Sequence, residues 1–390
     1  MLIRCFAIVL ASLWLSAVAA VSDPITPAPP KLAASAYLLV EARTGRVLVD
    51  HNSSQRLPPA SLTKIMTSYV SAFELQKGSI SLSEEVPVSV KAWRMKGSLM
   101  FIQEGTRVKL EDILRGIIIQ SGNDASVALA EHIAGSEDVF VDLMNQHALR
   151  LGMLDTNFVN ATGWPHEDHY TSAKDLAKLT RVLIERFPEH YKIYSEKTFT
   201  YNEISQRNRN KLLFRDKTVD GVKTGHTKAA GYCLVTSAVR NGMRLIAVVM
   251  GAPSEDRRAR ESQKLLTYGF RYYETVDLYA RNESLRKVRV WGGAHSSINL
   301  GLAEDVVVTI ARGARDNLTA NMEIDSEIHA PLKMGQELGS LTVTVGSTET
   351  VKRPLIALNA LEEAGFFGRL WDTISLFFLK IFGGDPLRIK

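Results

Sequence analysis

Ser61 and Lys64 lie three residues apart in the segment PPASLTKIMT, and only Ala60 separates the serine from Pro58 and Pro59. Residues three apart share one face of a helix. A serine hydroxyl is a weak nucleophile at neutral pH and needs a base. A lysine serves as that base only where burial or a second cation lowers its pKa. The pair predicts a serine nucleophile with an amine base at a helix start, although the short pattern S-x-x-K also fits an ordinary surface helix.

A second polar group, Ser121, Gly122 and Asn123, follows the apolar run IIIQ and precedes a helical segment. Buried polar groups need hydrogen-bond partners, so the triplet predicts a hydroxyl that relays protons and an amide that holds a substrate. The alternative is a helix–turn–helix junction in which Asn123 or Asp124 caps the second helix.

A third group, Lys223, Thr224 and Gly225, lies in VDGVKTGHT at the start of a strand-rich region. We expect Lys223 to be the cation that keeps Lys64 neutral. The Thr224 hydroxyl could bind a carboxylate, and Gly225 would let another backbone approach closely. The alternative is a plain turn between strands. Together, in this order and spacing, the three motifs match the set described for penicillin-binding proteins and class A β-lactamases.

Composition and the remaining motifs exclude several other functions. The formal net charge of +5 is small for 390 residues and the basic residues are scattered, which argues against nucleic-acid binding. No nucleotide-binding glycine pattern is present, so we expect no cofactor. The segment HEDHY, residues 166–170, does not match H-E-x-x-H, and we interpret it as a solvated polar loop and expect no metal. Cys233, in an apolar run, is interpreted as a small core residue.

The N-terminus has the pattern of a secretory signal peptide. Arg4 precedes an apolar run that ends in Ala17-Val18-Ala19, so we predict a signal over residues 1–20, with an uncleaved membrane anchor as the alternative. Residues 21–34 are Pro-rich and read as a linker. Removal of the signal takes Cys5 with it, which leaves one cysteine and no internal disulfide.

The pattern of helices and strands predicts how the motifs are held. A β-hairpin is expected at residues 36–52, and two strands within 231–252 meet at Asn241-Gly242, a strong hairpin signal. Helical periodicity is found in the segments 61–76, 110–120, 124–134, 137–152, 171–187 and 255–273. Strands at both ends therefore enclose a helical insert, and we predict one α/β (α+β) domain over residues 35–275.

The remainder of the chain differs in character. Residues 276–360 show short apolar runs and turns without an amphipathic helix, so we predict a small all-β domain. Residues 364–383 form an amphipathic helix with an aromatic-rich apolar face, and its charges argue against a membrane span. We favour a helix that lies in a membrane surface over one docked on the protein's own core.

The motifs resemble one known family. PASLTKIMT, ILRGIIIQSGNDASVALAE, NATGWPHEDHYTSAKDLA, NRNKLL, VDGVKTGHTKAAGYCLV and LLTYGFRYY are similar to low-molecular-mass penicillin-binding proteins, the D-alanyl-D-alanine carboxypeptidases of peptidase family S11. The resemblance implies a β-lactamase-like antiparallel sheet flanked by helices, a C-terminal β-domain and an amphipathic anchor helix. Leu99, in KGSLMFI, departs from the family pattern, which has a small polar residue there.

The resemblance also implies a role for each motif residue. Ser61 would be the acyl-ester nucleophile and Lys64 its general base. Ser121 would relay a proton, and Asn123 would contact the peptide amide.

Further residues would bind the ends of the substrate. Lys223 and Thr224 would hold its carboxylate, with Arg209 of the NRN segment as a second candidate. The oxyanion hole would combine the N–H of the nucleophile with one just past Gly225, at His226.

The function implied by this resemblance is removal of the terminal D-alanine from peptidoglycan pentapeptide stems, with β-lactams acylating the same serine. The protein would be exported and held at the periplasmic face of the inner membrane by its C-terminal helix. The alternatives are a DD-endopeptidase, a class A β-lactamase and a non-catalytic peptidoglycan-binding scaffold. The β-lactamase is disfavoured because no E-x-x-L-N follows the S-x-N motif.

Overall fold

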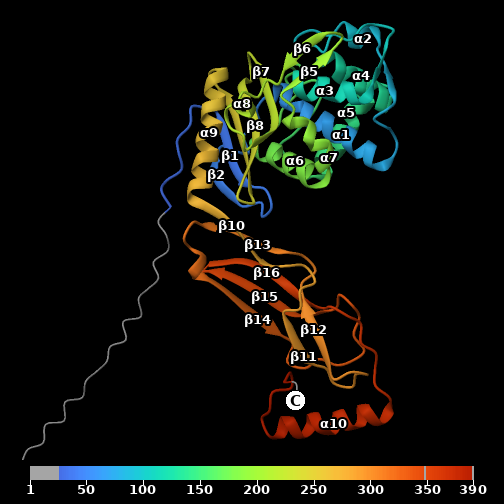
Figure 1. Ribbon diagram of the computed structural model, residues 1–390, viewed down its shortest axis with the longest axis vertical. Helices are drawn as coiled ribbons and strands as arrows, with labels where there is room; N and C mark the ends of the chain where they lie inside the picture. The colour runs from blue at the N-terminus through green and yellow to red at the C-terminus, as the bar shows by residue number, and fades with distance from the viewer. Residues whose placement is uncertain (1–25, 347, 389–390) are drawn as a thin grey trace, which may run out of the picture.

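The computed structural model describes residues 26–346 and 348–388, so the predicted signal peptide, residues 1–20, lies outside the described residues. The described chain is elongated (Figure 1). An α/β domain occupies one end, an all-β domain follows it, and the C-terminal helix lies at the other end. The predicted fold class is confirmed.

A five-stranded antiparallel sheet forms the base of the first domain. Its strand order is β2-β1-β9-β8-β7. The strands are β1 (Ala36–Glu41), β2 (Val47–His51), β7 (Val219–Thr227), β8 (Gly231–Arg240) and β9 (Met243–Ala252). Both predicted hairpins are confirmed, and the β8–β9 turn falls at Asn241 and Gly242, which have positive φ angles. β7 is an edge strand, so one of its sides has no strand partner within the described ranges.

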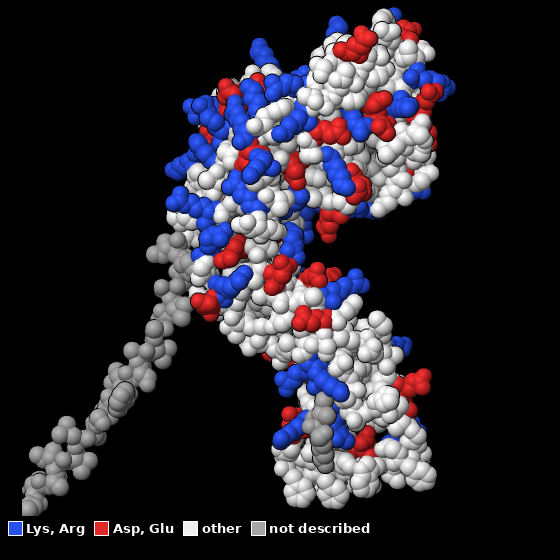
Figure 2. All heavy atoms as spheres, in the orientation of Figure 1, with Lys and Arg blue, Asp and Glu red and all other residues white. Residues whose placement is uncertain are grey.

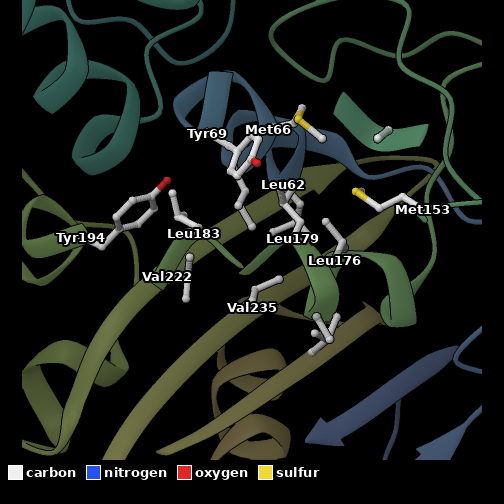
Figure 3. Close-up of a cluster of buried hydrophobic side chains, with 14 of the residues drawn as sticks. Leu62, Met66, Tyr69, Met153, Leu176, Leu179, Leu183, Tyr194, Val222 and Val235 are labelled. Carbon is white, nitrogen blue, oxygen red and sulfur yellow. The ribbon is translucent and has the colours of Figure 1, made fainter. Parts of the chain in front are cut away.

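Both faces of this sheet are covered, which explains the continuous apolar run LIAVVM in β9. Ile246, Val248 and Met250 point into the core shared with the helical insert. The alternate residues Leu245, Ala247 and Val249 point to the other face, which α9 (Glu255–Tyr272) covers. Figure 3 shows the first of these cores, with Leu62, Met66 and Tyr69 close to Leu179 and Leu183 over the sheet residues Val222 and Val235.

The helical insert lies between β2 and β7. Its helices are α1 (Lys64–Lys77), α2 (Val90–Trp93), α3 (Leu110–Arg115), α4 (Asn123–Ala134), α5 (Glu137–Arg150), α6 (Ala173–Arg186), α7 (Pro188–Tyr191) and α8 (Leu212–Arg215). Two small two-stranded sheets complete it, β3 (Glu85–Pro87) with β4 (Arg107–Lys109) and β5 (Thr198–Tyr201) with β6 (Ile204–Arg207). Ser172 caps α6, because its Oγ accepts from the N–H of Asp175. Gly122 stands at the N-cap of α4, so neither Asn123 nor Asp124 caps this helix as the alternative interpretation required.

The predicted helix over 110–120 is only half α-helical. α3 ends at Arg115 and continues as one π-helical turn, Gly116–Gln120. The carbonyl of Gly116 accepts from the N–H groups of both Ser121 and Gly122, which closes the widened turn. Such turns often occur at functional sites, and this one sets the direction in which the chain enters the Ser121 motif.

The second domain consists of two antiparallel sheets. One has the order β11-β12-β16-β15-β14 and the other pairs β10 with β13. The strands are β10 (Tyr273–Tyr279), β11 (Arg286–Arg289), β12 (Ser297–Gly301), β13 (Val306–Ala311), β14 (Leu318–Ile324), β15 (Glu337–Val345) and β16 (Thr348–Ala357). The predicted all-β class of the C-terminal domain is confirmed, and its first strand, β10, begins at Tyr273.

The two domains meet through a buried polar contact. Glu41, fully buried, accepts hydrogen bonds from Thr44 N and Thr44 Oγ1, each at 2.7 Å, and from Thr309 Oγ1 of β13 at 3.3 Å. Arg43 pairs with Asp277 of β10 beside it. The β1–β2 turn therefore fixes the β-domain against the edge of the first domain. A cavity of about 1000 Å³ opens next to this contact, between the first domain and the β-domain.

The C-terminal helix α10 (Phe366–Ile381) confirms the predicted amphipathic helix. No helix within the described ranges is both long and apolar enough to cross a bilayer.

Candidate active site

Ser61 lies on a short 3-10 turn, Ala60–Thr63, that leads directly into α1. The preceding residue, Ala60, has a φ of 49°, a left-handed conformation that costs energy for a residue other than glycine. Thr63 Oγ1 donates to the Ala60 carbonyl at 2.9 Å and lies 2.9 Å from His169 Nε2. These contacts hold the strained turn and with it the position of the serine.

His169 supports this turn as a neutral imidazole. It is almost fully buried, and burial lowers its pKa to about 4, with small contributions from His166 and Lys64. Its Nδ1 accepts from the Val159 N–H, so Nε2 carries the proton and donates to Thr63. The interpretation of HEDHY as a solvated loop was therefore right for residues 166–168, which are exposed, and wrong for His169. No metal-ligand cluster exists among the described residues.

Lys64 is buried beside Ser61. Its Nζ lies 3.2 Å from Ser61 Oγ, 2.7 Å from Asn123 Oδ1 and 2.6 Å from the Thr162 carbonyl oxygen. Burial, reinforced by the Arg209 guanidinium and opposed by Asp124, lowers the pKa of Lys64 to about 7. We expected Lys223 to be the cation responsible. Burial is the main cause and the Arg209 guanidinium adds to it, and the two buried lysines are close enough for Lys64 to lower the pKa of Lys223.

The Thr162 carbonyl comes from a tight loop, Asn160–Trp164. Asn160 Oδ1 accepts hydrogen bonds from the backbone N–H groups of Thr162, Gly163 and Trp164 at 2.8–3.1 Å. Gly163 has a φ of +84°, and a Cβ there would lie 1.8 Å from the Ala60 carbonyl oxygen. Only glycine lets this loop contact the Ser61 turn, because any side chain would collide with the backbone.

Ser121 follows the π-helical turn with a φ of 71°, again left-handed. Its Oγ is buried and has no hydrogen-bond partner among the described residues. Buried hydroxyls are normally paired, so this orphaned group at the site is available for another hydrogen-bond partner.

Asn123 connects Lys64 to the opposite wall. Besides its bond to Lys64, its Nδ2 donates to the Lys96 carbonyl at 2.6 Å, and its N–H donates to the Ser98 carbonyl at 2.7 Å. Asp124 accepts from the N–H groups of Met100, Phe101 and Ile102 at 2.8–3.2 Å. The start of α4 therefore fixes the whole 96–102 segment over the site.

The Lys223 motif lies on β7, whose backbone passes against Ser61. A Cβ on Gly225 would lie 2.9 Å from the Pro59 carbonyl oxygen and 3.2 Å from Ser61 N. Lys223 is buried, and its Nζ donates to the Thr224 carbonyl at 3.2 Å. Burial, followed by Lys64, Arg209 and Arg258, lowers the pKa of Lys223 well below its usual value.

The outer residues of the site are held by α9 and by stacking. Arg258 of α9 is buried and donates to the Gly225 carbonyl at 3.1 Å. The His226 ring stacks on Tyr232, with ring centres 4.0 Å apart. Arg209 is near enough to lower the pKa of both buried lysines, and burial lowers its own pKa in turn.

The structure therefore brings the three motifs together at one place. Sequence reasoning missed the Thr162 carbonyl, Asn160, Asp124, His169 and Arg258, all of which position other residues. The glycine in NATGW was the one available signal for the loop. The other contacts depend on long-range packing that no local pattern encodes.

Comparisons with known proteins agree with this geometry. A family model described as D-alanyl-D-alanine carboxypeptidase, peptidase S11, matches residues 23–254, and one described as penicillin-binding protein 5, C-terminal domain, matches residues 273–363. The chain is 43% identical to "D-alanyl-D-alanine carboxypeptidase DacC" of Escherichia coli (strain K12), over 96% of this chain and 95% of that protein. It is 42% identical to DacA of the same organism, over 92% and 91%.

A solved structure shows the same architecture. Penicillin-binding protein 5 from Haemophilus influenzae superposes with a TM-score of 0.82 at 40% identity, covering 86% of this chain and all of that one. Fold and site together define a serine acyl-transfer enzyme of the penicillin-binding class. The chain belongs to the peptidase S11 family of D-alanyl-D-alanine carboxypeptidases, and the predicted family and enzyme class are confirmed.

Proposed function

We propose that this enzyme removes the terminal D-alanine of peptidoglycan pentapeptides through an acyl-enzyme on Ser61. One observation carries the proposal. Lys64 Nζ has three neighbours, and two of them, Asn123 Oδ1 and the Thr162 carbonyl, only accept hydrogen bonds. A neutral amine donates to both and directs its lone pair at the third neighbour, the Ser61 hydroxyl. That is the geometry of a general base.

The acylation step follows from this arrangement. Ser61 Oγ attacks the carbonyl carbon of the penultimate D-alanine while its proton passes to Lys64 Nζ. The N–H groups of Ser61 and His226 stabilise the oxyanion. The C–N bond then breaks, the amide nitrogen takes the proton from Lys64 through the Ser121 hydroxyl, and D-alanine leaves. Asn123 holds the amide of the acyl part.

Deacylation reuses the same base. Lys64 takes a proton from water, the hydroxide oxygen attacks the ester carbon, and Ser61 Oγ recovers its proton as the shortened peptide leaves. Lys223, Thr224 and Arg209 bind the carboxylate of the terminal D-alanine. A β-lactam presents a carboxylate and a reactive amide at the same spacing, so it acylates Ser61 and is released slowly.

The test is release of D-alanine from a soluble pentapeptide analogue by the purified enzyme, with products separated by chromatography. Free D-alanine with a tetrapeptide supports the proposal. Cleavage of a cross-linked dimer without release from the pentapeptide would identify an endopeptidase. Rapid catalytic turnover of nitrocefin with no peptide cleavage would identify a β-lactamase, and no reaction with either would identify a scaffold.

The pH dependence of acylation tests the role of the base. Because only neutral Lys64 accepts the serine proton, the second-order rate of acylation by benzylpenicillin should rise with pH and level off above a midpoint near the lowered pKa of about 7. In Arg209→Gln the cation is removed, so the pKa of Lys64 rises and the midpoint moves to higher pH. Arg215→Gln removes an exposed charge on α8 and should leave the midpoint in place. An unchanged midpoint in Arg209→Gln would contradict this assignment.

The location of the enzyme is proposed from both ends of the chain. A cleaved signal over residues 1–20 exports the protein, and α10 then binds the periplasmic surface of the inner membrane. α10 contacts the β-domain through its polar side: Asp372 accepts from Arg289 at 3.1 Å and from the Gly292 N–H at 2.8 Å, and Leu376 is buried. Its aromatic side faces outward, with Phe367 83% and Trp371 71% exposed. The end of the molecule formed by α10 is largely uncharged in Figure 2.

Membrane binding by this face should depend on its aromatic residues. Phe367→Asp and Trp371→Asp combined should weaken binding to phospholipid vesicles by at least about tenfold, because each ring buries apolar area in the interface. Cosedimentation of each protein with the vesicles measures this. Met334→Asp, which changes an equally exposed apolar residue in the β-domain, is the control. Equal vesicle binding by the wild type and the double variant would show that the aromatic face of α10 is not the membrane anchor.

A further inference from the structure

A cavity of about 360 Å³ lies beside the nucleophile and has no part in the chemistry described above. Three segments meet around it. Pro58 and Pro59 precede the Ser61 turn, Trp164 and Glu167 belong to the loop that follows Gly163, and Thr227 ends β7. The cavity therefore touches the elements that hold Ser61 without including any residue of the base or the carboxylate site.

The direction of the substrate follows from the strand that flanks the site. β7 is the edge strand of the sheet, so an extended peptide can lie beside it as an added strand. Lys223 and Thr224 come before Gly225 in this strand, and Thr227 comes after it. If the terminal carboxylate lies at Thr224 and the scissile carbonyl at Ser61, the acyl part continues toward Thr227, at about 3.3 Å per residue. The residue that precedes the two D-alanines then lies at the cavity.

The walls of the cavity suit an aliphatic chain. Pro58, Pro59 and Trp164 provide apolar surface. The Trp164 backbone is held by Asn160, whose Oδ1 accepts from the Trp164 N–H at 3.0 Å and whose Nδ2 donates to the Trp164 carbonyl at 3.0 Å. The indole is 46% exposed and lies next to Gly97 across the site. A fixed, half-exposed indole at the edge of a binding site is a common recognition element.

The charge at the cavity is negative. Glu167 forms no ion pair within the described ranges, in contrast to Asp168, which lies 3.9 Å from His166 Nδ1. Two histidines also line the wall. His169 contacts Thr63 and is neutral at physiological pH, and His166 lies beside Asp168. Glu167 is therefore the group left to meet a charged ligand, and an ammonium group is its natural partner.

We propose that this cavity is the subsite for the side chain of the third stem residue, and that it selects an aliphatic side chain ending in a free amino group. The inference rests on the proposed function. The methylenes pack between the two prolines and Trp164, and the ammonium pairs with the Glu167 carboxylate. Glu167 acts on binding and on specificity, and not on the bond-breaking step.

Two substrates that differ only in this amine test the proposal. Nα-acetyl-L-lysyl-D-alanyl-D-alanine has a free side-chain amine, and the Nα,Nε-diacetyl form does not. The wild type should cleave the first with a kcat/KM about three- to fivefold higher, the size expected for an exposed ion pair, and 0.5 M NaCl should reduce this ratio. Active enzyme in each preparation is counted by titration with a labelled penicillin.

The variants locate the source of the preference. Glu167→Gln should bring the ratio of the two kcat/KM values to about one, whereas the matched control Asp168→Asn should keep the wild-type ratio. Trp164→Ala should lower kcat/KM for both substrates and leave their ratio unchanged, because it removes the apolar wall and no charge.

The outcomes separate this proposal from the function on which it rests. If D-alanine is released from both substrates at equal rates by the wild type, or if Glu167→Gln keeps the preference, the subsite assignment is overturned and the carboxypeptidase stands. If neither substrate releases D-alanine from enzyme that the penicillin titrates, the proposed function itself fails.

Discussion

Ser61→Ala should take no covalent label from a fluorescent penicillin, and Lys64→Met should be labelled at least about a hundredfold more slowly than the wild type at pH 8. At that pH most wild-type Lys64 is neutral, since its pKa is about 7. Methionine keeps the volume of the buried side chain but has no lone pair basic enough to take the serine proton. Stopped labelling reactions analysed on gels give the rates directly.

Stability must be measured beside the rates. Lys64 donates hydrogen bonds to Asn123 and Thr162, so Lys64→Met leaves two buried acceptors unpaired, each at a cost of about 1–3 kcal/mol. It also removes an amine whose burial is unfavourable, which offsets part of that cost. If thermal melting shows a folded Lys64→Met protein that is acylated within tenfold of the wild-type rate, Lys64 is not the base.

Much of the site was predictable because each motif combines residue types with a local element. Ser61 and Lys64 lie on one face at the start of α1, Ser121 and Asn123 lie at a helix junction, and Lys223 lies on a strand. The helix and hairpin patterns were predictable for the same reason, because the periodicity of apolar residues reports which face is buried.

The errors have a common physical origin. Lys223 was expected to set the pKa of Lys64, but the largest cause is burial and Arg209 contributes, and neither is visible in the sequence near either lysine. The segment 166–170 was read as solvated, yet His169 is buried because the 163–169 loop folds back onto the Ser61 turn. The α-helix expected through Gln120 widens into a π turn at Gly116, where the distant Met100 side chain packs against the glycine. Burial and long-range contact decide each of these, and local patterns do not specify them.

Gly163→Ala should lower the rate of acylation by at least about a hundredfold, although residue 163 has no functional group. A Cβ at 1.8 Å from the Ala60 carbonyl oxygen cannot be accommodated, so the loop or the Ser61 turn must move. Movement of the loop takes the Thr162 carbonyl away from Lys64 Nζ, and movement of the turn displaces Ser61 from its base. Displacement of a catalytic group by about 1 Å is enough for an effect of this size.

Gly105→Ala is the matched control for backbone strain. Gly105 has a φ of +73°, close to the value at Gly163, but an added Cβ there meets nothing within 4 Å. Both variants should therefore lose about 1 kcal/mol of unfolding free energy, because each places an alanine in the left-handed conformation. Only Gly163→Ala adds a collision. Urea unfolding of both proteins measures the loss of stability, and penicillin labelling measures the effect of the collision on catalysis. Equal labelling rates would show that contact between the loop and the Ser61 turn does not set the catalytic geometry, whereas a loss confined to Gly163→Ala would show that this glycine keeps base and nucleophile aligned.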